Sequence, residues 1–118
     1  SGQERCAKLL TTYQKEGREV PDAIIAGNDL IGIGCMASIV EAGYKVGSDI
    51  AVVGFDDVSH ARLPQIQLTT VRVPRQEMGR VASAQILELL KNPHTGFLTR
   101  ELIKPRLIIR KTTCKVKT

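Results

Sequence analysis

Two pairs of polar residues follow two apolar runs of the sequence, and both pairs carry side chains that can bind a polar ligand. Asn28 and Asp29 follow the first run, and Asp56 and Asp57 follow the second. An asparagine amide offers hydrogen-bond donors and an acceptor, whereas an ionised aspartate offers two acceptors. Because a sugar hydroxyl both donates and accepts, Asn28 and Asp56 together suit a polyol or a similar polar ligand. A structural role also fits, in which Asn28 and Asp29 cap a helix and the two later aspartates begin a turn.

The surrounding pattern predicts elements that would bring the two pairs together. Short apolar or β-branched runs predict strands, the first of them buried on both faces, at residues 23–26, 50–55, 68–73, 102–103 and 107–109. Amphipathic spacing predicts helices at residues 3–17, 29–43 and 75–91. A loop or one-turn helix is expected through His60. This order is typical of an α/β domain with a largely parallel sheet flanked by helices. In such a sheet, ligands bind beyond the carboxyl ends of the strands, where both polar pairs would lie.

The composition favours one soluble domain. The chain has 118 residues, enough for a single core, and no apolar run approaches the roughly 18 residues of a membrane span. Without a signal-peptide pattern at its start, we expect a cytoplasmic protein with no membrane partner. Three widely spaced cysteines, Cys6, Cys35 and Cys114, argue against a disulfide framework or a zinc site. His60 and His94 lie far apart with no acidic cluster at ligand spacing, so we expect neither a metal nor a cofactor.

The formal net charge of +5 makes nucleic-acid binding a hypothesis to weigh. The excess of positive charge lies late in the chain, at Lys104, Arg106, Arg110, Lys111, Lys115 and Lys117. These residues alternate with apolar ones, as in a strand followed by an exposed tail, and aromatic residues that could stack on bases make up only 3% of the chain. We therefore interpret them as a solvated edge and terminus.

Two enzyme hypotheses find little support in the residues. The segment 32–37 fits the dinucleotide-binding pattern G-x-G-x-x-A, and Asp56 follows at about the spacing of its acidic residue. In that fingerprint, however, the glycines lie in the turn between strand and helix, whereas Gly32 and Gly34 fall inside the predicted helix and favour close helix packing. For nucleophilic catalysis there is no G-x-S-x-G elbow, and Cys35 is expected to be buried and inert. We expect no enzyme.

Four segments resemble the lactose/galactose-repressor (LacI/GalR) family, in the order in which the family carries them. They are PDAIIAGND with the following IG, GYKVGSDIAVVGFDD, LTTVRVP with a following MG, and RLIIRKTT, at residues 21–34, 43–57, 68–79 and 106–113. The resemblance covers nearly the whole chain. It implies a periplasmic-binding-protein-like fold, in which an effector binds between two lobes.

The resemblance implies that residues 1–118 form one partial effector-binding domain. Residues 1–73 and about 102–113 would belong to the C-terminal lobe. Residues of about 75–95 would belong to the other lobe, after a crossover at about 73–74. The DNA-binding headpiece of the family is absent from this sequence.

The resemblance also implies a set of ligand-binding residues. Asn28 and Asp56 fall where the family contacts its effector, usually a sugar or a nucleobase-like molecule. Ile25 matches a pocket-wall position. Val73 departs from the pattern, because glutamine is common there, which suggests a more apolar or differently oriented ligand. Arg75 is a hypothetical contact for a phosphate or carboxylate.

The family also forms dimers through the C-terminal lobe, and Ile33, Leu63 and Pro64 fall at its interface positions. Core packing fits these three residues equally well. We expect an effector-sensing and dimerisation module of a transcriptional repressor, which would contact operator DNA through its headpiece and not through this segment. The alternatives are a periplasmic sugar-binding protein of the same fold and a nucleotide-cofactor enzyme.

Overall fold

The computed structural model describes residues 1–94 and 100–113, so Cys114, Lys115 and Lys117 lie outside the described part of the chain. The chain divides into two compact units. The first unit consists of Ser1–Arg72 with Arg106–Thr118, and the second unit is Val73–Pro105. The chain thus leaves the first unit once and returns to it once.

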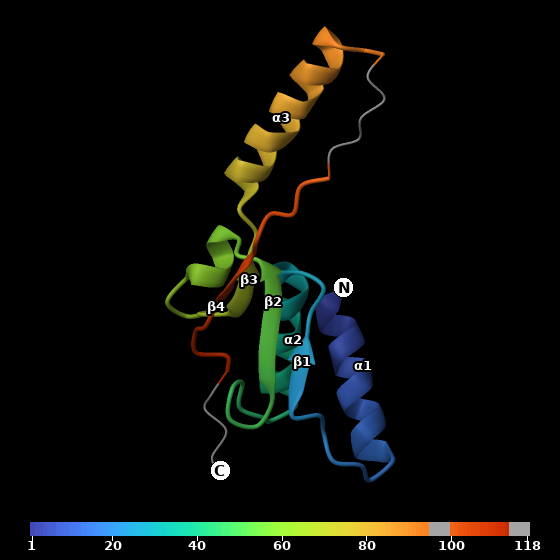
Figure 1. Ribbon diagram of the computed structural model, residues 1–118. Coiled ribbons are helices and arrows are strands. Elements are labelled where there is room, and N and C mark those ends of the chain that lie inside the picture. Colours follow the sequence, from blue (N-terminus) through green and yellow to red (C-terminus); the bar gives the residue numbers. More distant parts are fainter. Residues whose placement is uncertain (95–99, 114–118) are drawn as a thin grey trace. The chain divides into compact units, whose positions relative to one another are not determined.

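A four-stranded sheet in the order β1-β2-β3-β4 organises the first unit (Figure 1). Its strands are β1 (Ala23–Ile25), β2 (Ala51–Asp56), β3 (Thr69–Arg72) and β4 (Arg106–Ile108). The first three strands run parallel, and β4 pairs antiparallel with β3. The predicted α/β class with a largely parallel sheet is therefore confirmed.

Two strand predictions are wrong in detail. The first strand was expected to be buried on both faces, but Ala23 and Ile25 are exposed and Ile25 retains 83% of its accessible surface. β1 pairs only with β2 among the described residues, and Ile24 alone packs against the core. The predicted strand at residues 102–103 is absent, since the chain there has no regular structure and β4 begins only at Arg106.

Two helices, α1 (Gly2–Lys15) and α2 (Asp29–Glu41), pack against each other, and α2 also packs on β2 (Figure 1). The 3₁₀ helix η1 (Ser59–Arg62) is the predicted single turn through His60. Gly17 and Gly43 follow the two helices with φ of 63° and 88°, the left-handed conformation in which glycine carries no steric penalty.

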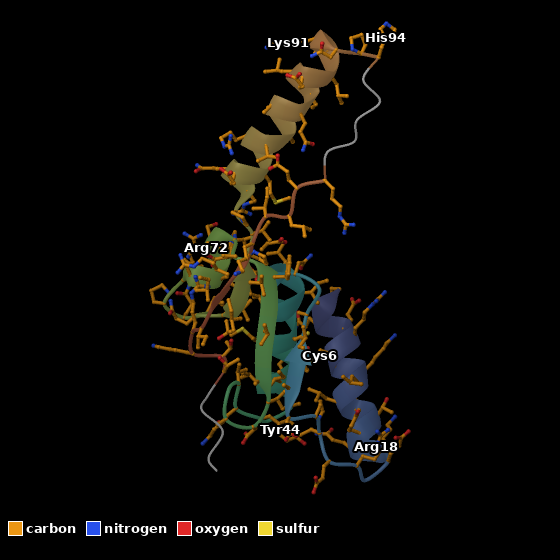
Figure 2. The ribbon with its side chains drawn as sticks, viewed as in Figure 1. Cys6, Arg18, Tyr44, Arg72, Lys91 and His94 are labelled. Atoms are coloured by element: carbon orange, nitrogen blue, oxygen red, sulfur yellow. The ribbon has the colours of Figure 1, made fainter. Side chains whose placement is uncertain are left out.

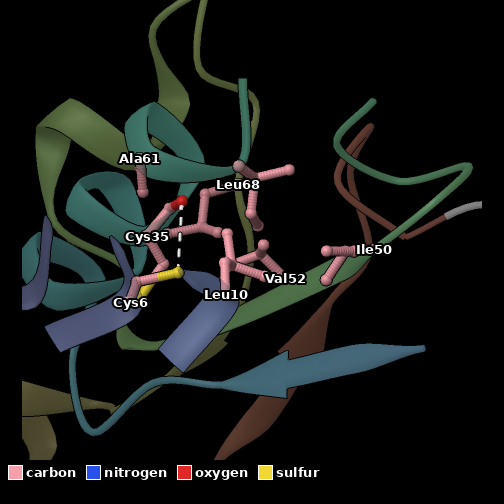
Figure 3. Packing of buried hydrophobic residues seen from close by; sticks show 8 residues of the cluster. Cys6, Leu10, Cys35, Ile50, Val52, Ala61 and Leu68 are labelled. Atoms are coloured by element: carbon pink, nitrogen blue, oxygen red, sulfur yellow. Dashed lines mark hydrogen bonds between the residues drawn. The ribbon is translucent and has the colours of Figure 1, made fainter. Parts of the chain in front are cut away.

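The core of the first unit forms where α1, α2 and the sheet meet (Figure 3). Its buried residues are Cys6, Leu10, Cys35, Ile39, Ile50, Val52, Ala61 and Leu68. The Cys6 thiol lies 3.7 Å from the Cys35 carbonyl oxygen, to which it donates. Burial, together with the neighbouring Cys35 thiol, raises the pKa of Cys6 to about 12, and burial also raises the pKa of Cys35. Both thiols are therefore inert at neutral pH, as predicted for Cys35.

Gly34 allows α1 and α2 to approach closely. A Cβ atom at Gly34 would lie 2.8 Å from the backbone nitrogen of Gln3, and the nearby Ser38 hydroxyl donates to the Gln3 carbonyl at 2.7 Å. A Cβ at Gly32 would meet the Leu68 side chain at 3.3 Å. Both glycines thus lie inside α2 at packing contacts, as predicted.

The second unit contains α3 (Arg75–Lys91), which begins and ends as predicted. Among its described residues only Val81 is a buried apolar side chain, whereas Met78, Ile86, Leu87, Leu89 and Leu90 are exposed. A hollow of about 320 Å³ lies between this helix and the returning chain, lined by Met78, Val81, Ala82, Gln85, Arg100, Glu101 and Ile103. Within residues 1–94 and 100–113, no helix is both long enough and apolar enough to cross a bilayer.

Candidate functional site

Asn28 lies at the carboxyl end of β1, where it caps α2. Its side-chain oxygen accepts a hydrogen bond from the Ile31 N–H at 2.9 Å, which satisfies one of the free amides of the first helical turn. The amino group of the same side chain makes no hydrogen bond to the described residues. Asn28 therefore caps the helix and still offers donors to a ligand.

Asp56 ends β2 at the same edge of the sheet. β1 and β2 are parallel, with Ala23 paired to Ala51 and Ile25 to Val53, so both strands run toward the same edge of the sheet, and Asn28 follows β1 there. The carboxylate of Asp56 makes no ion pair or hydrogen bond within the described part of the chain. Its backbone φ is 103°, a region that residues other than glycine rarely occupy.

Asp29, the neighbour of Asn28, is fully buried and structural. One oxygen of its carboxylate accepts from the Val58 N–H at 2.7 Å, and the other accepts from the Thr70 hydroxyl at 2.5 Å. The side chain thereby joins the start of α2 to the segment after β2 and to β3. The absence of a side chain at Gly54 leaves room for this carboxylate, because a Cβ on Gly54 would collide with it.

Asp57, the neighbour of Asp56, is also fully buried and lies among three arginines. Its carboxylate contacts Arg72 Nε at 2.6 Å, Arg110 Nη2 at 2.7 Å and Arg62 Nη2 at 3.0 Å. Figure 2 labels Arg72 next to η1. Burial by itself would raise the pKa of Asp57, but hydrogen bonds from Arg110 and Arg72 and the charge of Arg62 outweigh it and lower that pKa.

In each polar pair, one residue makes structural hydrogen bonds or ion pairs and the other is available to a ligand. Asp29 and Asp57 are buried and hydrogen-bonded, whereas the Asn28 amide donors and the Asp56 carboxylate have no partner within residues 1–94 and 100–113. The capping and binding interpretations of Asn28 are compatible. Asn28 and Asp56 thus offer an amide donor and a carboxylate acceptor at the edge where parallel strands end, the two kinds of group that a hydroxyl can bind.

The arginine cluster around Asp57 was not found from the sequence. Arg72 and Arg110 were interpreted as part of a strand and of a solvated edge, yet the Arg110 side chain is only 10% exposed. The signal available was a second aspartate after a strand, since neighbouring residues at a strand end point in different directions. The arginine partners could not be read from it, because Arg110 lies 53 residues away.

The remaining predicted ligand residues are divided between the units. Ile25 lies exposed on β1, at the edge of the sheet. Val73 and Arg75 belong to the second unit, whereas Asn28 and Asp56 belong to the first. They stay predictions.

The predicted interface residues fall partly on one apolar groove of the first unit, with a volume of about 600 Å³. Ile33 and Pro64 line it, whereas Leu63 does not and is 38% exposed. The other lining residues are Met36, Ala37, Val40, Glu41, Val46, Gln65, Ile66, Gln67, Lys111 and Thr112. The groove lies between α2 and the loop after η1.

Metal and cofactor hypotheses receive no structural support. Within residues 1–94 and 100–113, no three His, Cys, Asp or Glu side chains are placed to share a metal ion. Since Gly32 and Gly34 lie inside α2 and contact packed neighbours, they form no turn that could approach a pyrophosphate.

Comparison with known proteins places this geometry in a family. The profile of the periplasmic binding protein-like domain matches residues 2–113. The arabinose metabolism transcriptional repressor of Geobacillus stearothermophilus is 31% identical over 103 residues, covering 87% of this chain and 28% of that protein. The repressor PurR of Proteus mirabilis is 30% identical over 112 residues, covering 95% of this chain and 31% of that protein. The chain thus spans less than a third of these relatives.

Solved structures agree with the sequence comparison. A lac repressor dimer bound to operator and to the anti-inducer ONPF superposes with a TM-score of 0.80 at 32% identity, covering 95% of this chain and 37% of that one. A complex of the transcriptional regulator CelR with cellobiose gives a TM-score of 0.82 at 28% identity, covering 95% of this chain and 32% of that one. The chain therefore belongs to the periplasmic binding protein-like domain family and corresponds to the C-terminal portion of LacI/GalR repressors.

Proposed function

We propose that this chain is the effector-sensing and dimerisation module of a DNA-binding transcriptional repressor, and that its effector is a small sugar or sugar derivative. The observation that carries the proposal is that the Asn28 amide donor and the Asp56 carboxylate follow neighbouring parallel strands at the carboxyl edge of the sheet, both without a partner among the described residues. The module binds and releases its effector without making or breaking a bond, so it is not an enzyme.

The division of the chain supports a two-lobed binding site. The chain passes from the first unit to the second after Arg72 and returns before Arg106. In this proposal the first unit is most of the C-terminal lobe, and the second unit belongs to the other lobe. Ile25 contributes a wall of the pocket, and Val73 and Arg75 contact the ligand from beyond the crossover.

The relatives favour a repressor over a periplasmic sugar-binding protein. Several relatives are named as repressors, among them those of arabinose metabolism and of a ribose operon. In this proposal the protein acts in the cytoplasm, and operator DNA is bound by a headpiece that is not among these 118 residues. Effector binding would shift the population between two lobe arrangements and thereby change operator affinity.

The site is tested by Asn28→Ala and Asp56→Ala in the full-length repressor. Each variant removes a polar contact to the effector, so we expect each to weaken effector affinity by about 10- to 100-fold, as for a hydrogen bond to a charged or buried group. A thermal-shift panel of L-arabinose, D-ribose and cellobiose first selects the sugar, and calorimetric titration then gives the dissociation constant.

The matched control is Asp22→Ala, which removes an exposed carboxylate at the opposite, amino end of β1. It should leave the dissociation constant unchanged. Unaltered affinity in both Asn28→Ala and Asp56→Ala would contradict the site. The absence of binding by every sugar of the panel would contradict the sugar class.

We also propose that the groove beside α2 is the dimer interface. Ile33 and Pro64 line it from two different segments, and most of its lining side chains are apolar. Apolar surface removed from water at a two-fold axis would drive the association. Leu63 would lie at the rim, since the structure does not place it among the lining residues.

Ile33→Glu tests this interface. The substitution places a charge in an apolar contact of two chains, so we expect the full-length dimer to dissociate about 100-fold more readily, as measured by analytical ultracentrifugation. The control is Ile25→Glu, at an exposed position on β1 away from the groove. Ile33→Glu protein that stays dimeric at nanomolar concentration would contradict the proposal.

A further inference from the structure

We propose that Asp57 is the positioning residue of the effector site. Its buried carboxylate contacts Arg62, Arg72 and Arg110 and thereby fixes the backbone that presents Asp56. Through Arg72 and Arg110, the same carboxylate is connected to the strands by which the chain leaves and re-enters the first unit. The inference rests on the proposed function, because it assigns how that site is held and coupled.

The backbone at the site is strained and must be held in place. Asp56 and Asp57 are consecutive non-glycine residues with positive φ, at 103° and 54°. Such conformations are costly for residues with a Cβ and persist only where the surroundings determine them. Since the Asp56 carboxylate has no partner among the described residues, its own side chain does not hold it.

Side chains from other segments of the first unit hold the two residues that follow Asp56. Asp57 is anchored by its three arginines, and Arg62 Nη2 also donates to the Asp57 carbonyl at 3.2 Å. One residue later, the Val58 N–H is held by the buried Asp29 at 2.7 Å. The two residues that follow Asp56 are thus each held by contacts of their own.

Arg72 and Arg110 connect this turn with the two segments by which the chain leaves the first unit and returns to it. Arg72 ends β3 and is the last residue before the second unit begins at Val73. Arg110 follows β4, the strand on which the chain returns, and also donates to the Leu68 carbonyl at 2.8 Å. One carboxylate, next to the residue that binds the effector, therefore contacts the outgoing and the returning segment.

This arrangement gives Asp57 a role that general stability would not require. A shift of Asp56 on effector binding displaces Asp57, and Asp57 is bonded to the two segments that lead to the other lobe. We expect that Asp57 acts on effector affinity mainly by holding Asp56 in place. The Asp57→Asn variant keeps the size of the side chain but removes the charge that attracts three guanidinium groups.

Hydrogen exchange of the full-length, effector-free protein provides the first test. In Asp57→Asn we expect the peptide spanning residues 54–63 to exchange about tenfold faster, because the turn opens locally, while a peptide from α2 keeps its wild-type rate. Equal acceleration of both peptides would show a purely structural role and overturn the proposal, as would unchanged rates. If Asp57→Asn does not fold, Arg72→Gln replaces it, since the Arg72 side chain is 41% exposed.

A double-mutant cycle with the sugar that gives the largest shift among L-arabinose, D-ribose and cellobiose is the second test. Asp57→Asn should lower affinity about tenfold when Asp56 is present and less than about twofold in an Asp56→Ala background. Equal losses in both backgrounds would overturn the proposal. If no sugar binds, the sugar effector class fails, whereas the exchange experiment still decides whether Asp57 holds the turn.

Discussion

Gly54→Ala is expected to lower the free energy of unfolding by about 3 kcal/mol or more, at the upper end of the cost of overpacking a core. Gly54 lies in the middle of β2 and is buried. A Cβ there would collide with the Asp29 carboxylate, lie 2.8 Å from a Leu68 methyl carbon, and lie 3.1 Å from the Asp29 Cα. The Cα belongs to the first turn of α2, so the helix itself would have to move off the sheet.

Urea denaturation of the full-length protein measures this loss. The matched control is Gly27→Ala, because a Cβ at that position would meet only the Ile31 side chain, at 3.9 Å. We expect the control to change stability by no more than about 0.5 kcal/mol, as at an ordinary surface position. Similar midpoints for the two variants would contradict the close contact between β2 and Asp29.

Asp29→Ala is expected to destabilise the protein by about 2–5 kcal/mol, because it leaves a buried hydroxyl and a part-buried amide without an acceptor. The Val58 N–H and the Thr70 hydroxyl both lose their partner, and Thr70 is fully buried. Since Val58 lies two residues after Asp56, we also expect weaker effector binding in the fraction that remains folded.

Asp49→Ala is the matched comparison for this substitution. Asp49 also accepts a hydrogen bond from a backbone amide, the Lys45 N–H at 2.7 Å, but it does so at the exposed surface. Water replaces the lost acceptor there, so the expected cost is below about 1 kcal/mol. Thermal melts of both variants measure the two losses of stability. Equal losses would contradict the prediction that the buried hydrogen bonds of Asp29 cost more to remove than the exposed one of Asp49.

The local pattern of the sequence was enough to predict most elements. Helical spacing located α2 and α3, and β-branched runs located β2 and β3. β1 was misjudged because its apolar residues were taken to indicate burial on both faces. An edge strand with one neighbour exposes such residues, and the sequence of the strand does not say how many neighbours it has.

The candidate site could be predicted only in part. Residue type and position after a strand were sufficient to single out Asn28 and Asp56. Which aspartate of the pair Asp56 and Asp57 faces inward depends on backbone angles that no residue pattern near them specifies. The arginine partners come from three separate segments, so only the folded chain reveals the cluster.

The antiparallel pairing of β3 and β4 has a consequence for how this protein can vary. Arg72 and Arg106 are opposite each other in the last pair of that ladder, so the two strands form a β-hairpin whose turn is replaced by the entire second unit. Lengthening a loop costs only about 0.6 kcal/mol for each doubling, so a hairpin tolerates a large insertion at its tip. Different second units could therefore be exchanged at this tip during evolution while the sheet and its polar edge stay the same.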